Sequence, residues 1–516
     1  MIYALNVNSA TERVERYWEM CVGSCHAATA LREDYRRQLT RCARELGFRY
    51  VRFHGIFDDD MSVMKKSPYL GTYKLSFSNI DNIFDFLLEI GMKPFVELSF
   101  LPSCLKSGEQ TIFHYKGVTT PPNDPEAWVW LIKSFLSHLI ERYGRSEVRR
   151  WYFEVWNEPN LGGEGGLKNG GFWSGTMADY YELYAMTARA IKEADEAFRV
   201  GGPATSNNAY ICEMREYCEK NDVPLDFIST HHYPTDVVLG YGVENSRNFF
   251  KEFSELDKTD KAAVNALANE FVTFRKNIWK DVNRGVLTEM AKRARKEAGN
   301  LPLFYTEWSS LAGLPSDGSF GASFIAKTIP DNMGLADAYS YWTFSDILEE
   351  DGFPSAAFHG GYGLLTLQNV AKAPYRAFQL LHRLGEERYQ KKFAWETLDI
   401  YAFRDRSNNT VQLLCVNHQS LLHDVSVRTA EIELEGEKFA GCSPEIVRID
   451  DEHANAIKEW ERIGCPEYVT QAQVSALQSA SELKNEFLVA EREGEKLKLH
   501  FDVPPMGVAL VTVYLK

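Results

Sequence analysis

The sequence lacks a long apolar segment, an excess of positive charge and a paired cysteine motif. Nowhere do ~18 apolar residues run together, and the opening MIYALNVNSATERVERYWEM has no basic start followed by an apolar stretch, as a signal peptide would. The 57 Lys and Arg are outnumbered by 72 Asp and Glu, so the net charge of −15 repels phosphate backbones and anionic membranes. We therefore expect a cytoplasmic protein that binds neither nucleic acid nor a membrane.

The nine cysteines are scattered through the chain, and no two of them form a CxxC pair. An odd number of separated thiols is most simply explained by reduced cysteines that pack as small apolar residues in a cytoplasm. The sequence also lacks a GxGxxG motif after its first predicted strand, internal repeats and low-complexity segments. We expect no metal and no cofactor.

What the sequence does contain is ample material for a large core. Its 516 residues are 45% hydrophobic and 13% aromatic, as is typical of a globular protein. Because a single core stops growing at about 250–300 residues, at least two structural units are expected.

Helix-period stretches and short β-rich apolar runs alternate over the first two thirds of the chain. The eight predicted strands are 17–24, 48–56, 93–100, 150–158, 198–203, 226–233, 302–308 and 338–344. Helical connections between strands favour a parallel sheet, and eight such units indicate a closed (β/α)8 barrel of the α/β class. A doubly wound open sheet is the alternative, disfavoured by the missing glycine motif.

The pattern changes near residue 350. Short alternating runs such as LDIYAFRD, NTVQLLCVNH and GVALVTVYL predict an antiparallel β-sandwich, interrupted by a helix-period insert at 470–484. We predict N-terminal strands at 1–14 that join this sandwich, a catalytic barrel at 15–350 and the sandwich at 351–516. The long segment 237–300 is expected to extend over the barrel mouth.

Two acidic residues stand at the ends of predicted strands. Glu158 follows Trp156 and Asn157 at the end of the fourth strand, and Glu307 ends the seventh. Chemistry in such barrels lies at the C-terminal ends of the strands, so these two carboxyl groups should face each other across the mouth. Hydrolysis of a glycosidic bond needs such a pair: an acid for the leaving oxygen, and a carboxylate that attacks or activates water.

The chain resembles the β-xylosidases of glycoside hydrolase family 39, within the large clan of retaining glycosidases whose acid/base motif is Asn-Glu-Pro. The resemblance spans nearly the whole chain and is carried by Cys21-Val22-Gly23-Ser24, Phe53-His54-Gly55, Thr119-Thr120-Pro121-Pro122, Trp156-Asn157-Glu158-Pro159-Asn160-Leu161, Val200-Gly201-Gly202-Pro203, His231-His232-Tyr233, Tyr341-Trp342-Thr343-Phe344-Ser345-Asp346 and His359-Gly360-Gly361-Tyr362-Gly363-Leu364. The loop 162–173 is longer and richer in glycine than the family pattern.

The resemblance implies that Glu158 is the acid and then the base, and that Glu307 is the nucleophile. Arg52 is the candidate cation beside Glu307, with an ion pair to Glu97 or Glu154 as its structural alternative, and Tyr233 is a candidate donor to Glu307. The remaining substrate-binding candidates are Asn157 at the sugar 2-hydroxyl, His54 and His231 at ring hydroxyls, Trp342 under the ring, and Glu349 and Glu350 at distal hydroxyls, where the acidic pair rests on the resemblance. Phe113 and Tyr115 are added, apart from the resemblance, as candidate walls of the pocket.

These residues predict a retaining exo-glycosidase that hydrolyses β-1,4-linked xylooligosaccharides to xylose, and the resemblance suggests a homo-oligomer. One alternative is the same machinery acting on an α-L-arabinofuranoside, a β-galactoside or a uronide. The other is a carbohydrate-binding protein without catalysis.

Overall fold

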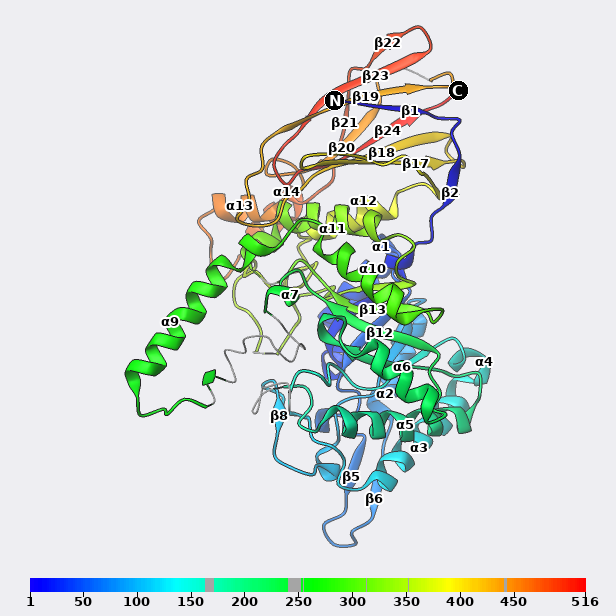
Figure 1. Ribbon diagram of the computed structural model, residues 1–516, viewed down its shortest axis with the longest axis vertical. Coiled ribbons are helices and arrows are strands. Elements are labelled where there is room, and N and C mark those ends of the chain that lie inside the picture. The colour runs from blue at the N-terminus through cyan, green and yellow to red at the C-terminus, as the bar shows by residue number, and fades with distance from the viewer. Residues whose placement is uncertain (163–170, 240–251, 254, 312, 351, 440–442) are drawn as a thin grey trace.

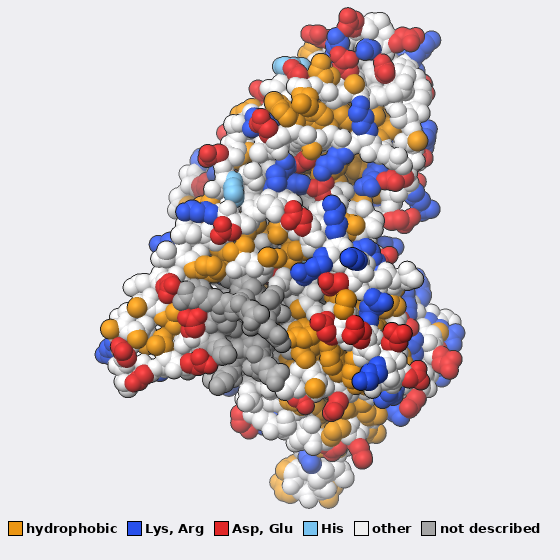
Figure 2. All heavy atoms as spheres, in the orientation of Figure 1, with side chains coloured by type: hydrophobic (Ala, Val, Ile, Leu, Met, Phe, Trp, Pro, Cys, Tyr) orange, Lys and Arg blue, Asp and Glu red, His pale blue; other side chains and the backbone are white. Residues whose placement is uncertain are grey.

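The computed structural model describes residues 1–162, 171–239, 252–253, 255–311, 313–350, 352–439 and 443–516. A barrel wrapped in helices forms the lower part of the molecule in Figure 1, and a β-rich unit that contains both termini lies above it. Figure 2 shows acidic and basic side chains interspersed over one face. No helix in the described part of the chain is long and apolar enough to cross a membrane.

Eight parallel strands close into a barrel, which confirms the predicted fold class. In chain order they are β3 (Cys21–His26), β4 (Tyr50–His54), β7 (Lys93–Glu97), β10 (Tyr152–Glu154), β11 (Arg199–Thr205), β12 (Phe227–His232), β13 (Leu303–Trp308) and β14 (Ala338–Tyr341). Each predicted strand overlaps one of the eight, although the strand predicted at 150–158 is shorter and ends at Glu154, so that Glu158 lies in the turn after it. Phe95, Phe227 and Phe304 share a buried apolar cluster within the barrel. Glu307 lies near the C-terminal end of β13 and Glu158 follows the C-terminal end of β10, the face where such barrels carry their active sites.

Helices cover the outside of the barrel. They include α1 (Glu33–Leu46), α2 (Ser78–Glu89), α3 (Pro125–Tyr143), α5 (Met177–Ala194), α6 (Ile211–Lys220), α10 (Val286–Ala298), α11 (Ser319–Asn332) and α12 (Ala373–His382). The helix α12 packs against α11 and α1, so the last helix of the barrel layer lies beyond residue 350.

The upper unit consists of two sheets. One has the order β1 (Ile2–Asn6), β19 (Arg428–Glu435), β23 (Lys496–Val503) and β22 (Glu491–Glu493). The other runs through β2 (Thr11–Arg13), β15 (Glu387–Tyr389), β17 (Leu398–Asp405), β18 (Thr410–Asn417), β24 (Val508–Tyr514), β20 (Glu445–Ile449) and β21 (Asn485–Phe487). The N-terminal strand β1 pairs in parallel with β19, and β2 pairs with β15. A shared apolar cluster, separate from that of the barrel, lies between the two sheets.

A buried ion cluster fixes the loop that follows the eighth barrel strand. The Nζ atom of Lys372 lies 2.6 Å from Asp317 and 2.7 Å from Asp346, and all three side chains are buried. The two aspartates also accept hydrogen bonds from the backbone N–H groups of Gly360 and Gly363. Lys372 therefore joins segments that bring Glu350 and Tyr362 to the barrel mouth.

We predict that Lys372→Met destabilises the protein by about 3–5 kcal/mol, because it leaves two buried acids without their cation. The matched control is Lys458→Met, which breaks ion pairs of an exposed lysine with Asp451 and Glu461. Such exposed pairs contribute at most about 1 kcal/mol. Urea unfolding measures both, and equal midpoints for the two variants would contradict the structural role of the cluster.

Candidate active site

Glu158 lies in a tight turn after β10. Its φ of 40° and the φ of 74° at Trp156 are backbone conformations that residues other than glycine seldom adopt. The turn is held by a bond from the Glu158 N–H to the Ala204 carbonyl at 2.9 Å and by one from the Trp156 indole to the Phe172 carbonyl at 2.8 Å. These contacts direct the Glu158 carboxyl group, only 6% exposed, into the barrel mouth.

Glu307 lies near the end of β13, and both of its carboxyl oxygens accept hydrogen bonds. Arg52 Nη1 donates to Oε1 at 2.9 Å, and the Tyr233 hydroxyl donates to Oε2 at 2.8 Å. The structure thus brings together the two donors that the sequence proposed for this group. A carboxylate with one charged and one neutral donor is held in a single orientation.

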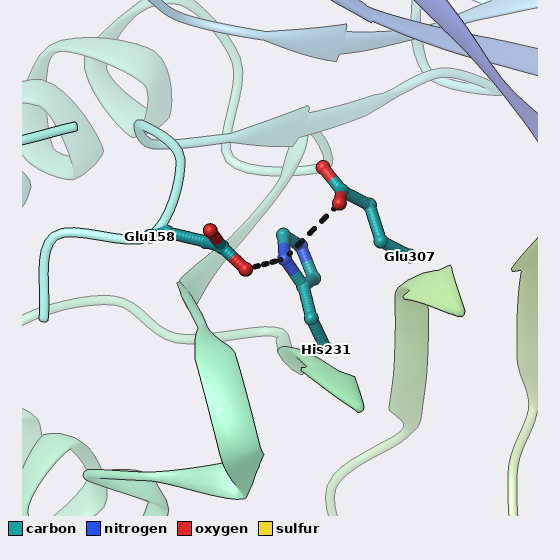
Figure 3. Close-up of side chains that lie close together, drawn as sticks. All are labelled: Glu158, His231 and Glu307. Atoms are coloured by element: carbon teal, nitrogen blue, oxygen red, sulfur yellow. Dashed lines mark hydrogen bonds and ion pairs between the residues drawn. The ribbon is translucent and has the colours of Figure 1, made fainter. Parts of the chain in front are cut away.

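His231 on β12 lies between the two acids, as Figure 3 shows. Its Nδ1 is 2.9 Å from Glu158 Oε1 and 3.7 Å from Glu307 Oε2, and its Nε2 is 3.1 Å from the Thr306 hydroxyl. Both ring nitrogens therefore have protein partners, and the ring lies against the acids rather than among the pocket-lining side chains. Burial moves the pKa of His231 well below its usual value, which favours the neutral ring.

The two carboxyl groups are close enough for a double displacement. One oxygen of Glu158, one oxygen of Glu307 and a nitrogen of His231 all lie within 4.8 Å of one another. Carboxyl groups stand about 5–5.5 Å apart in retaining glycosidases and about 6.5–9.5 Å apart in inverting ones. The same three residues are the one group in the described chain with the spacing of metal ligands.

The surroundings of Glu158 favour its protonated form. Burial raises its pKa well above the ordinary value, and the nearby charges of Glu307 and Asp236 raise it further. Glu158 accepts no bond from Arg52, whereas Glu307 does. Two identical side chains thus have different surroundings, which is how an acid and a nucleophile can coexist near neutral pH.

Arg52 is the centre of the charged network below the mouth. Its fully buried guanidinium lies 2.5 Å from Glu154, 2.8 Å from Glu97 and 2.9 Å from Glu307. Arg52 therefore forms both of the ion pairs considered from the sequence: the structural one with Glu97 and Glu154, and the one with Glu307. Burial raises the pKa of Glu154, although the nearby charge of Arg52 acts to lower it.

His54, at the end of β4, connects this network to the pocket. Its Nδ1 is 2.8 Å from Glu97 and its Nε2 is 3.7 Å from Glu307. Burial is the largest effect on the pKa of His54 and lowers it, but the charge of Glu97, the hydrogen bond to Glu97 and the charge of Glu307 together outweigh burial, so the net shift is upward. The imidazole ring also lies 4.8 Å from the Trp342 ring, so it forms part of the aromatic floor.

Asn157 has an unused donor. Its Oδ1 accepts a bond from Arg52 at 2.8 Å, while the buried Nδ2 has no hydrogen-bond partner among the residues that the structure describes. Leaving a buried N–H donor without a partner destabilises the folded protein. A ligand bound beside the two acids could accept a hydrogen bond from this donor.

The active-site pocket is lined by His54, Glu158, Leu161, Phe172, Ser206, Tyr233, Thr235, Asp236, Arg275, Ile278, Trp279, Glu307, Leu311, Trp342, Glu350 and Tyr362. Trp342 can reach the floor because Gly23 has no side chain: a Cβ there would lie 2.6 Å from the indole. This explains why a glycine follows Val22 in the first strand.

Two of the predicted substrate-binding residues, Glu349 and Phe113, are not among the described residues that line the pocket. Glu349 is turned toward His26, at 3.1 Å from Nδ1, so Glu350 is the member of the acidic pair that lines the pocket. Phe113 packs against the rings of His54 and Phe172. Tyr115 stacks on His26 with ring centroids 3.9 Å apart. Most of the glycine-rich loop, residues 163–170, lies outside the described part of the chain.

Sequence reasoning missed several lining residues, among them Phe172, Asp236, Arg275 and Trp279. Phe172 ends the loop after Glu158, and Asp236 follows the His-His-Tyr motif, so proximity to a motif could have indicated both. Burial raises the pKa of Asp236 to about 8, and its Oδ2 accepts the Tyr233 N–H at 2.8 Å. Arg275 and Trp279 are far from any motif, and no local signal marks them.

Comparisons with known proteins agree with this arrangement. The model of the family described as glycosyl hydrolases family 39 matches residues 1–271 and 267–496. A β-xylosidase of Caldicellulosiruptor saccharolyticus is 44% identical over 99% of this chain and 98% of its own, and one of Geobacillus stearothermophilus is 31% identical over 92% and 88%. The crystal structure of a monomeric β-xylosidase from Caulobacter crescentus CB15 has a TM-score of 0.80 at 30% identity, and covers 100% of this chain and 99% of its own.

We predict that Glu307→Gln lowers the pKa of Glu158. The neutral amide removes the negative charge that resists ionisation of Glu158, while the contribution of burial remains; a decrease of about one unit or more is expected. Carbon-13 NMR of labelled glutamate measures the titration in the wild type and the variant. An unchanged or higher pKa would show that the two acids do not interact as the geometry indicates.

Proposed function

The chain belongs to glycosyl hydrolase family 39, and from this premise we propose that it is a retaining, exo-acting β-xylosidase that releases xylose from the non-reducing ends of β-1,4-xylooligosaccharides. The observation that supports this most strongly is the close pair of carboxyl groups, of which one is in surroundings that favour its protonated form and the other accepts hydrogen bonds from a cation and a hydroxyl. Glu158 has a raised pKa, and Glu307 accepts bonds from Arg52 and Tyr233. The β-xylosidase relatives at 44% and 31% identity support the choice of xylose.

In the first step, an oxygen of Glu307 attacks the anomeric carbon and the bond to the leaving oxygen breaks. The proton of Glu158 passes to that oxygen as it departs, and a glycosyl ester with Glu307 forms. In the second step, Glu158, now a carboxylate, takes a proton from water, and the hydroxide attacks the anomeric carbon. The ester bond breaks, Glu307 is restored, and two inversions give retention.

The remaining contacts suit a pyranose held at this centre. The free Asn157 amide can donate to the sugar 2-hydroxyl, a bond that strengthens as positive charge develops on the ring. Trp342 offers an apolar face to the ring, and His54 with Glu350 can hold hydroxyl groups. His231, whose nitrogens are both engaged, serves in this proposal to orient Glu158.

The proposed function extends to the compartment and the oligomeric state of the protein. All eight cysteines in the described part of the chain are free, which supports a reducing compartment, and we propose a cytoplasmic enzyme. Homo-oligomer formation stays a prediction, and light scattering of the purified protein measures it directly.

We predict that azide rescues the two catalytic variants with opposite stereochemistry. Glu158→Ala removes the acid/base, so an activated aryl β-xyloside with azide should give the β-xylosyl azide; Glu307→Ala removes the nucleophile and should give the α-azide. Without azide, each variant should lose about a hundredfold or more in turnover. Proton NMR identifies the product anomer.

The control is Glu193→Ala, an exposed carboxylate paired with Lys133 on the barrel surface, which should retain wild-type turnover. A panel of nitrophenyl glycosides tests the sugar. Faster hydrolysis of an arabinofuranoside, a galactoside or a glucuronide than of the β-xyloside would contradict the xylose assignment but leave the roles of the two acids intact. Wild-type activity in both catalytic variants would overturn those roles.

A further inference from the structure

Residues 275–279, in the long segment between β12 and β13, contribute to one wall of the active-site pocket. The helix α9 (Lys261–Asn277) projects from the body in Figure 1, and its C-terminal end returns to the barrel, where η7 (Ile278–Asp281) follows. Arg275, Ile278 and Trp279 from this region line the pocket together with the catalytic acids. The junction of α9 and η7 is thus part of the pocket surface as well as a connection between strands.

A series of contacts connects this wall to the turn that carries Glu158. Asn160, two residues after the acid, exchanges hydrogen bonds with the backbone of Ser206, which begins η6 (Ser206–Asn208). The turn η6 packs against α7 (Asp236–Leu239), and α7 packs against η7. These neighbours extend from the Glu158 side of the pocket, and the leaving oxygen must lie beside Glu158 to receive its proton.

The glycone side has different walls. Trp342 and Glu350 follow the eighth strand, and His54 ends the second. None of these three residues lies in η6, α7 or η7, the elements that connect the Glu158 turn to Arg275 and Trp279. The sugar that is released as xylose and the group it leaves behind therefore meet different parts of the chain.

Arg275 carries a positive charge into an acidic pocket. Among the described lining residues it is the one Arg or Lys, and the carboxyl groups are those of Glu158, Asp236, Glu307 and Glu350. Within the part of the chain that the structure describes, Arg275 forms no ion pair, and its guanidinium lies 6.0 Å from the ring of Phe271 on its own helix. Its planar donor fork remains available to a ligand carboxylate.

Trp279 adds an apolar surface next to this charge. Its side chain is half-buried and lines the pocket. The indole packs edge to face against Phe320, with ring centroids 5.8 Å apart. An aromatic face packs well against the C–H face of a sugar ring. The wall thus combines a sugar platform with an anion-binding group.

We propose that Arg275 is a specificity-determining residue that binds the carboxylate of an acidic leaving group. The substrate class is a xylooligosaccharide whose xylose next to the cleaved bond carries a uronic acid branch. Such a branch would meet repulsion from the pocket acids that are ionised, Glu307 among them, and Arg275 offsets it where the leaving group lies. This inference rests on the proposed β-xylosidase activity.

The test compares Arg275→Gln with Lys276→Gln. Lys276 is the next residue on α9, is exposed and does not line the pocket, so the control loses the same charge nearby. The substrates are xylobiose and xylobiose with glucuronic acid on its reducing-end xylose. In Arg275→Gln, the ratio of kcat/KM for the acidic over the neutral substrate should fall about tenfold from the wild-type ratio, as for loss of a charge-assisted hydrogen bond. Lys276→Gln should keep the wild-type ratio within about twofold.

Two results would overturn the inference. One is an Arg275→Gln ratio equal to that of Lys276→Gln. The other is a loss confined to nitrophenyl glucuronides relative to nitrophenyl xylosides, which would place the carboxylate on the glycone side. Arg275→Lys, which keeps the charge but not the fork, should give an intermediate ratio. Failure of the proposed function is distinguishable, because the wild type would then not hydrolyse neutral xylobiose.

Discussion

The active site depends on one buried cation. Arg52 is fully removed from solvent at the end of a barrel strand, and its donors contact Glu97, Glu154, Glu307 and Asn157. A buried guanidinium is stable only when acids surround it, and buried acids need such a cation in return. Glu307, the proposed nucleophile, is therefore one member of a network that also fixes the amide of Asn157 and the position of His54. Removing the charge would affect all of these positions together.

The same network explains how two glutamates can do different chemistry. Arg52 and Tyr233 reach Glu307, while Glu158 receives neither and stands in an apolar turn beside Trp156. Burial and the negative charge of its partner raise the pKa of Glu158, so it can hold a proton for the departing oxygen. His231 bridges the pair as a neutral ring. The asymmetry follows from position: Glu307 lies on β13 within reach of Arg52 and Tyr233, whereas Glu158 lies in the turn after β10.

Regular alternation made the barrel predictable, because each strand and helix carries its own periodicity and eight parallel units have few ways to close. Glu158, Glu307 and Arg52 were predictable because strand ends converge at one rim. What a single sequence could not reveal was orientation: adjacent Glu349 and Glu350 look alike, yet the first turns to His26 and the second to the pocket. Arg275 and Trp279 reach the mouth through a long excursion whose path no local pattern determines. Their roles arise from tertiary packing alone.

The central claim is that Glu307, held by Arg52, forms the covalent bond to the sugar. A 2-fluoroxyloside with an activated leaving group should accumulate the ester, because the fluorine slows both steps and the good leaving group speeds only the first. Peptide mass spectrometry after digestion at low pH then locates the label. The structure predicts a single labelled peptide with the sugar on Glu307. A label on another carboxylate, or turnover without any covalent adduct, would contradict the account.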